Sequence, residues 1–161
     1  MKSVMKRWAL LVALVVMSFA GGYAQEPSQV ENTVDAIVKK YDGVDKVQCV
    51  KVAKGSGLKL LKMMLKREFG KEFMQGVTSI TIINYSEASQ ETCQAIRQEL
   101  DVFASMLEEF NVGEDERFSD SEHARCFVSI LPDAEIISDF IIAMEDREMK
   151  VVMHMAGEIK L

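Results

Sequence analysis

The feature that most constrains the fold of this chain is a short apolar run near its N-terminus. The run covers residues 8–20 (WALLVALVVMSFA), contains no charge, and follows Lys2, Lys6 and Arg7. A basic start, an apolar stretch of this length and small residues after it are typical of a secretory signal peptide. A helix that spans a membrane needs about 20 apolar residues, so the run is too short for an anchor. We therefore predict a signal peptide at residues 1–24.

The predicted cleavage site follows Ala24, because Gly22 and Ala24 provide the small residues that such a site requires. A bacterial lipoprotein would carry a cysteine directly after this site, whereas the first cysteine of the chain is Cys49. We therefore expect an exported protein, periplasmic or extracellular, that is not a lipoprotein. The length of residues 25–161 is within the commonest range for a single domain, so we expect one exported domain.

The charge balance of the chain argues against nucleic acid as a partner. The chain has 19 basic and 25 acidic residues and a formal net charge of -6. Binding to a phosphate backbone normally needs a surplus of positive charge. The charge is also uneven, since residues 25–72 sum to +3 and residues 73–161 sum to -12. This distribution fits either a surface that steers partners or two solvated surfaces without a role.

Hydrophobic periodicity and turn residues predict a single α+β domain with the element order α-β-α-β-α-β-β-β. Residues 136–144 fit both a helical and a strand period, and their β-branched content favours a strand. The last three strands have short connections, which predicts an antiparallel meander in a mostly antiparallel sheet, with the helices packed on one face. The helices are expected at residues 28–41 and 58–69 and from Ser86 or Ser89 to Phe110. The strands are expected at residues 47–53, 77–84, 124–131, 136–144 and 149–156.

The three cysteines, Cys49, Cys93 and Cys126, would all remain in the exported chain. An oxidising compartment favours disulfides, but three cysteines cannot all pair, and the sequence leaves open whether any two do. Cys93 falls near the start of the third predicted helix, where a helix dipole can lower the pKa of a thiol. It also lies on the apolar stripe of that helix, so we expect the cysteines to be buried core residues.

Two groups of residues have the composition of a metal site. Met149, Met153, His154 and Met155 offer the soft ligands that copper prefers. On a strand, however, the three methionines share one face and His154 points to the other, which favours a core role. The acidic segment 114–123 lacks the ligand spacing of a calcium loop and is expected to be solvated. We therefore predict neither a metal nor a cofactor.

Residues 55–69 contain two features that are compatible with binding. Gly55, Ser56 and Gly57 precede the second predicted helix, but the phosphate-binding loop pattern is absent and Ser56 is expected to cap the helix. The helix itself is basic and amphipathic, which is compatible with a peripheral membrane contact. Covering the sheet explains the same apolar stripe and is the favoured interpretation.

Five segments of the chain together are typical of one protein family. They are the predicted exported N-terminus, the end of the first helix at Tyr41-Asp42-Gly43, GLKLLKMML at 57–65, the TIIN strand end, and the hairpin FIIAM…VVMHMAGEI closing on Gly157. In these segments the chain resembles a family of small exported Bacteroidetes proteins known only as domain of unknown function 4252. The resemblance covers nearly all of the exported chain and adds no catalytic residue. It implies an envelope location and, for some members, a link to envelope-stress operons.

No catalytic residue is singled out, because the two histidines lie in no nucleophile or metalloprotease motif. We therefore expect a non-catalytic exported envelope module that acts through protein contacts, with a regulatory or stress-linked role. One alternative is a binding protein for an apolar or lipid-like ligand, suggested by the methionine-rich and isoleucine-rich interior. A second is a cryptic hydrolase that uses carboxylates or Cys93.

Overall fold

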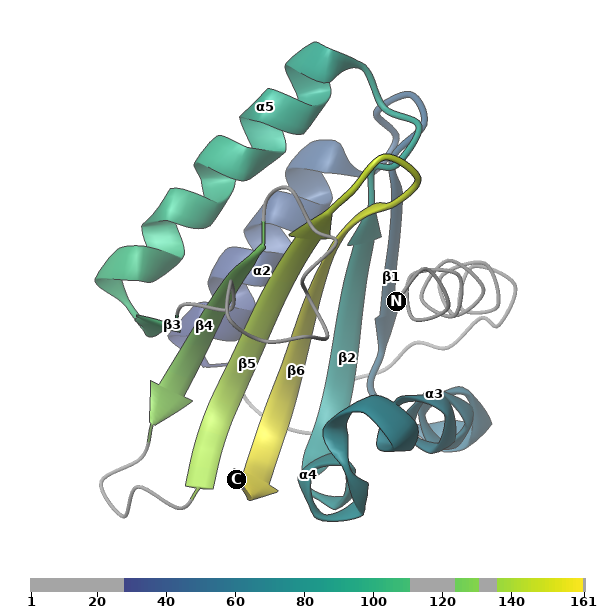
Figure 1. Cartoon of the computed structure of the whole chain (residues 1–161), viewed down its shortest axis with the longest axis vertical. Coiled ribbons are helices and arrows are strands. Elements are labelled where there is room, and N and C mark those ends of the chain that lie inside the picture. The colour runs from purple at the N-terminus through teal and green to yellow at the C-terminus, as the bar shows by residue number, and fades with distance from the viewer. Residues whose placement is uncertain (1–27, 111–123, 131–135, 161) are drawn as a thin grey trace.

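The computed structural model describes residues 28–110, 124–130 and 136–160, which form one α+β domain. The helices are α2 (Gln29–Tyr41), α3 (Gly55–Phe69), α4 (Lys71–Gln75), α5 (Gln90–Glu99) and the 3-10 helix η1 (Leu100–Ser105). The strands are β1 (Gln48–Val52), β2 (Val77–Asn84), β3 (Glu108–Phe110), β4 (Arg125–Ile130), β5 (Ile136–Glu145) and β6 (Lys150–Lys160). They form one antiparallel sheet in the order β1-β2-β6-β5-β4-β3 (Figure 1).

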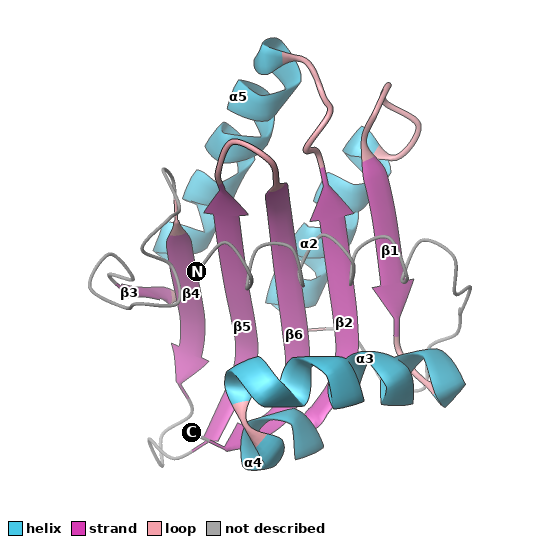
Figure 2. Cartoon of the chain, turned by 45° about the vertical axis from the view of Figure 1, so that its right-hand side comes forward, coloured by secondary structure: helices cyan, strands magenta, loops and turns pink. Residues whose placement is uncertain are grey.

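The helices lie on both faces of the sheet, so the prediction that they pack on one face is wrong. Helices α2 and α5 cover one face, whereas α3 and α4 cross the other face near one end of the strands (Figure 2). The reason is visible in β5, where residues 141–145 are buried without alternation. A strand that is apolar on both sides needs a cover on both sides.

Each face therefore has its own core. On the side of α3 and α4, Leu61, Leu65 and Met74 pack on strand residues such as Ile82 and Met153. On the side of α2 and α5, the helical stripes pack on the alternate strand residues. The helical residues of this second core include Ile37, Ile96 and Phe103, and its strand residues include Ile83, Phe127, Ile141 and Val152.

The third helix is shorter than predicted. The α-helix ends at Glu99, a 3-10 helix follows to Ser105, and residues 108–110 form a strand that pairs with β4. Leu100 and Phe103 are both buried and lie three residues apart, a spacing that one 3-10 turn satisfies as well as an α-helix does. Pairing of residues 108–110 then covers the backbone edge of β4, which would otherwise be open.

The predicted meander is confirmed, since β4 pairs with β5 and β5 pairs with β6. Residues 136–145 form a strand, as their β-branched content indicated. Strand β6 continues beyond Gly157 and passes very close to Gly76. A Cβ atom on Gly157 would lie 2.0 Å from the carbonyl oxygen of Gly76, so this crossing of the chain requires glycine.

The first two described helices begin in different ways. Helix α2 begins as expected, with the Ser28 hydroxyl accepting a hydrogen bond from the backbone N–H of Glu31 at 3.1 Å. Helix α3 begins at Gly55 and its N-cap is Lys54, so Ser56 lies inside the helix and does not cap it. The helix start at Gly55, with φ at 84°, replaces side-chain capping by a glycine turn.

Candidate functional site

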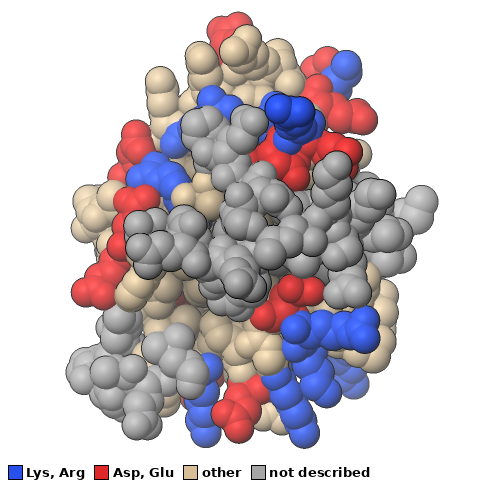
Figure 3. Space-filling model, in the orientation of Figure 1, with Lys and Arg blue, Asp and Glu red and all other residues tan. Residues whose placement is uncertain are grey.

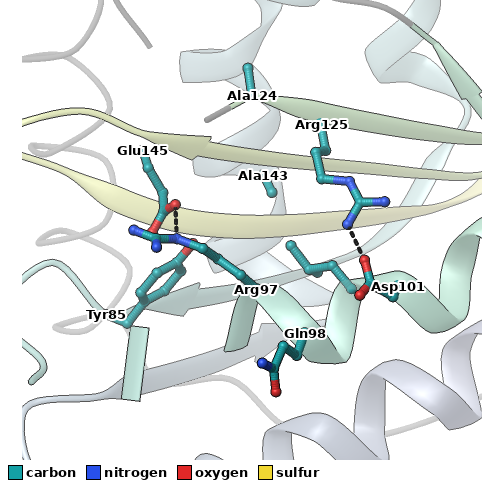
Figure 4. Close-up of a pocket in the computed structure, with 9 residues that line it drawn as sticks. Tyr85, Arg97, Gln98, Asp101, Ala124, Arg125, Ala143 and Glu145 are labelled. Atoms are coloured by element: carbon teal, nitrogen blue, oxygen red, sulfur yellow. Dashed lines mark hydrogen bonds and ion pairs between the residues drawn. The ribbon is translucent and has the colours of Figure 1, made fainter. Parts of the chain in front are cut away.

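A cleft of about 410 Å³ opens between the α5–η1 segment and strands β4 and β5 (Figure 4). Tyr85, Leu100 and Ala143 belong to the core on the side of the sheet that α2 and α5 cover, whereas Ala124 packs against the core on the other side. It combines a few apolar side chains with a larger set of polar ones. The lining consists of Leu100, Ala124 and Ala143, together with Tyr85, Arg97, Gln98, Asp101, Arg125 and Glu145.

An ion pair closes one end of the cleft. Arg97 Nε on α5 lies 2.5 Å from Glu145 Oε2 on β5, and the Glu145 side chain is only 4% exposed. The ring of Tyr85 is buried against this pair (Figure 4). Burial, and after it the negative charge of Glu145, raise the pKa of the Tyr85 phenol. Tyr85 therefore stays neutral at physiological pH and contributes a hydroxyl, not a charge.

A second arginine is fixed at the other end. Arg125 Nη1 donates to Asp101 Oδ1 at 2.7 Å, and its Nε and Nη2 donate to the two carboxylate oxygens of Glu109 at 2.8 and 3.2 Å. The guanidinium also lies 4.9 Å from the centre of the Phe127 ring. A bidentate bond to a carboxylate and stacking on a ring restrict the conformations of an arginine side chain. Arg125 is therefore held in one position at this end of the cleft.

The electrostatics of the cleft follow from these two pairs. Both guanidinium groups are already neutralised by the carboxylates of Glu145, Asp101 and Glu109. Three carboxylates therefore face two guanidinium groups, so the cleft offers no surplus positive charge for a free anion. No serine, cysteine, histidine or lysine belongs to its described lining. A polar rim beside apolar side chains is the composition of a recognition surface.

A second polar group is buried on the same side of the sheet. His154 Nε2 lies 2.8 Å from Asp139 Oδ1, with the two side chains 1% and 3% exposed. Thr81 is the partner of His154 in the strand register, and Lys51 is the partner of Thr81. In the described part of the chain, Thr81 Oγ1 and His154 Nδ1 have no hydrogen-bond partner. These residues form a polar row across four strands.

The row connects the sheet to α2. Lys51 Nζ donates to Glu31 Oε1 at 2.8 Å and to Asp35 Oδ1 at 3.1 Å. At the other end of the row, the Ser138 hydroxyl donates to Asp139 Oδ2 at 2.9 Å. The row is nearly closed to solvent at His154 and Asp139, so it holds the layers together and is not placed to meet a substrate.

The methionine cluster is placed as the strand pattern predicts. Met149, Met153 and Met155 belong to the core beneath α3 and α4, and His154 lies on the other face. None of the three methionines lines the cleft. Within the described residues, no group of three or more histidine, cysteine or acidic side chains is placed to hold a metal ion.

The cysteines occupy different layers of the domain. Cys93 and Cys126 are buried on opposite sides of the sheet, Cys49 is half-buried on β1, and no disulfide links the three. The Cys93 thiol faces the backbone carbonyl oxygens of Tyr85 and Ala88 at 3.8 and 3.7 Å. Burial, together with Asp42, raises the pKa of Cys49 to about 11. Burial of Cys93 and Cys126 confirms the predicted core role.

Two sequence predictions concern residues that the structure does not describe, namely the signal peptide at 1–24 and the acidic segment 114–123. For α3, the predicted burial is confirmed at Leu61 and Leu65. None of the described helices has the length and apolar character needed to cross a membrane.

Sequence reasoning did not find the cleft. Arg97, Arg125 and Glu145 are separated by 20 to 48 residues along the chain and belong to no motif. The comparisons with known proteins add no site, because no protein-family model, no curated protein and no solved structure matches the chain. A local signal exists for the polar row but not for the cleft: Ser138-Asp139 are two polar residues that interrupt an otherwise apolar strand.

Proposed function

We propose that this protein is a non-catalytic exported module of the bacterial envelope, and that the cleft beside α5 receives a segment of a protein partner. One observation carries the proposal. Both arginines of the cleft are held by carboxylates, so the cleft offers shape and apolar contact instead of a reactive group. Leu100, Ala124 and Ala143 provide that apolar contact.

The geometry favours one anchoring side chain from the partner. Binding energy at protein interfaces is concentrated in a few large side chains that enter pockets surrounded by a polar rim. A cleft of about 410 Å³ is at the small end of the range for ligand pockets and has room for such an anchor. Gln98 is exposed on the rim and is available to bond the partner's backbone.

The location and the family are parts of the same proposal. The apolar run at residues 8–20 supports export, and the resemblance to the Bacteroidetes family supports an envelope location. A regulatory or stress-linked role would follow from an association with a second envelope protein.

An apolar or lipid-like small molecule is the second candidate, because three apolar side chains line the cleft. The methionines that suggested this ligand are packed in the opposite core and do not contribute to the cleft. The protein partner is therefore the better supported of the two.

Native mass spectrometry of the protein, isolated gently from its own envelope, tests this proposal. We expect a second polypeptide at fixed stoichiometry. An adduct with the mass of a lipid would instead support the small-molecule alternative. A bare polypeptide, obtained under conditions that preserve known envelope complexes, would count against both.

A further inference from the structure

Helix α3 has an outward side with an unusual composition. Lys59, Leu60, Met63, Lys66 and Arg67 are all exposed and recur at intervals of three and four, which places them on one side of the helix. Met63 is 65% exposed and Leu60 is 38% exposed. Three cations therefore surround two apolar side chains, and no acidic residue belongs to this outward side of α3.

The outward side is not needed for the fold. The opposite side of α3 carries Leu61 and Leu65, which are 2% and 0% exposed in the core of that sheet face. That inward side already covers the sheet, so it accounts for the apolar stripe that the sequence shows. Leu60 and Met63 are two further apolar side chains of α3, and both are exposed instead of packed on the sheet.

The cations of the outward side also lack the carboxylate partners that four other basic residues of the domain have. Lys40, Lys51, Arg97 and Arg125 each form an ion pair with a carboxylate. In the part of the chain that the structure describes, the three cations of the outward side have no carboxylate partner, and neither do two exposed lysines at the ends of α3 and α4. These five residues are Lys59, Lys66, Arg67, Lys54 and Lys71.

This concentration of positive charge stands out in an acidic protein. Residues 54–72 contain six basic and two acidic side chains, while the rest of the predicted exported chain contains 10 basic and 23 acidic ones. Lysine and arginine side chains gather over α3 and α4 in the space-filling view (Figure 3). A local cluster of this kind complements an anionic surface, whereas the rest of the protein would be repelled by it.

We propose that the outward side of α3 docks on the surface of a bilayer that contains anionic phospholipids. Lysine and arginine would meet the headgroups, while Met63 and Leu60 would enter the boundary between headgroups and acyl chains. Two apolar side chains give shallow and reversible binding, not insertion. Because α3 and the cleft lie on opposite faces of the sheet, the docked protein presents the cleft away from the membrane.

Vesicle sedimentation tests the proposal with the protein as processed by the producing cells. Two vesicle types are compared: pure phosphatidylcholine, and three parts phosphatidylcholine to one part phosphatidylglycerol. The salt concentration is about 100 mM, where charges act over about 10 Å. We expect binding to the anionic vesicles only, and loss of binding as salt rises.

Matched variants assign the binding to α3. Lys59→Gln combined with Lys66→Gln should weaken binding about 30-fold, since each cation near an anionic surface contributes a factor of about five. The control, Lys39→Gln combined with Arg147→Gln, removes the same charge from exposed positions outside α3 and should retain wild-type binding. Met63→Asp should also reduce binding, and its exposure makes it compatible with folding, which circular dichroism checks.

Three results would overturn the proposal. The first is a wild-type protein that does not sediment with anionic vesicles. The second is an equal loss of binding in the control pair, which would indicate a general charge effect. The third is equal binding to pure phosphatidylcholine, which would assign the contact to another apolar segment such as residues 8–20.

Discussion

Arg97 on α5 and Glu145 at the end of β5 form an ion pair with very unequal burial. The two side chains are 37% and 4% exposed, and their Nε and Oε2 atoms lie 2.5 Å apart. The pair ties the helix to the sheet where the cleft opens. It places a negative charge in the interior and its compensating positive charge close to solvent.

Because the two side chains are buried to different extents, we expect their replacements to lower the free energy of unfolding by different amounts. Arg97→Gln removes the compensation of a buried carboxylate and should lower the free energy of unfolding by about 3 kcal/mol. Glu145→Gln leaves an arginine that water can reach, and should cost only about 1 kcal/mol. Urea denaturation of both variants, with the exposed Arg147→Gln as a neutral control, measures the difference. Equal losses would show that burial does not govern this pair.

The buried pair of His154 and Asp139 should behave differently, because both side chains are almost fully covered. Asp139→Ala and His154→Ala are each expected to cost about 2–4 kcal/mol, since either removes one side chain of the pair and leaves the other buried without this bond. The double variant should cost at least about 1 kcal/mol less than the sum, because the second change removes a group that has already lost its partner. Additive losses in a double-mutant cycle would mean that the two residues are not coupled.

Alkaline pH should destabilise the fold through Cys49. The pKa of this thiol is about 11 in the folded chain, against an ordinary value of 9.0. The folded state therefore holds a proton that the unfolded state releases, so stability is intact below pH 9 and falls between pH 9 and 11. Cys49→Ser should make the stability curve flatter in this interval. Tyr85, with its pKa also raised, adds a fall above pH 10 that the variant retains.

The crossing of Gly76 and Gly157 predicts an unusually costly alanine substitution. Gly157→Ala would place a Cβ atom 2.0 Å from the Gly76 carbonyl oxygen, and backbone is hard to displace. We expect a loss of at least about 3 kcal/mol. Gly43→Ala is the matched control, because Gly43 has φ at 87° but open space around it, and should cost only about 1–2 kcal/mol. Similar melting temperatures for the two variants would contradict the close approach.

Periodicity was sufficient to predict most of the elements. The meander of β4, β5 and β6 was predictable because each strand is bounded by turn residues. The continuous apolar run at residues 140–144 indicates helices on both faces, which the prediction of a single covered face leaves unexplained. The third helix was extended too far because Leu100, Phe103 and Leu107 fit several local conformations. Only pairing with β4, a contact distant in sequence, decides between them.

The cleft could not be predicted from the sequence for a related reason. Arg125 acquires its role from Asp101 and Glu109, which are far from it in the chain and become its neighbours only when β3 pairs with β4. In a chain with 44 charged residues, no pattern marks these three among the others. By contrast, the face on which each methionine of β6 lies was predictable, because strand alternation is a local property.

Site-specific photo-crosslinking in producing cells tests whether the cleft receives a protein partner. A photoreactive residue replaces Gln98 on the rim of the cleft or, as the matched control, Gln75, an exposed glutamine at the end of α4 on the other side of the sheet. The account predicts one adduct of defined mass from position 98 and none from position 75. Ala143→Leu narrows the cleft and should abolish the adduct; because Ala143 is buried in the core, circular dichroism checks that this variant is still folded. No adduct from position 98, or the same adduct from both positions, would contradict the account.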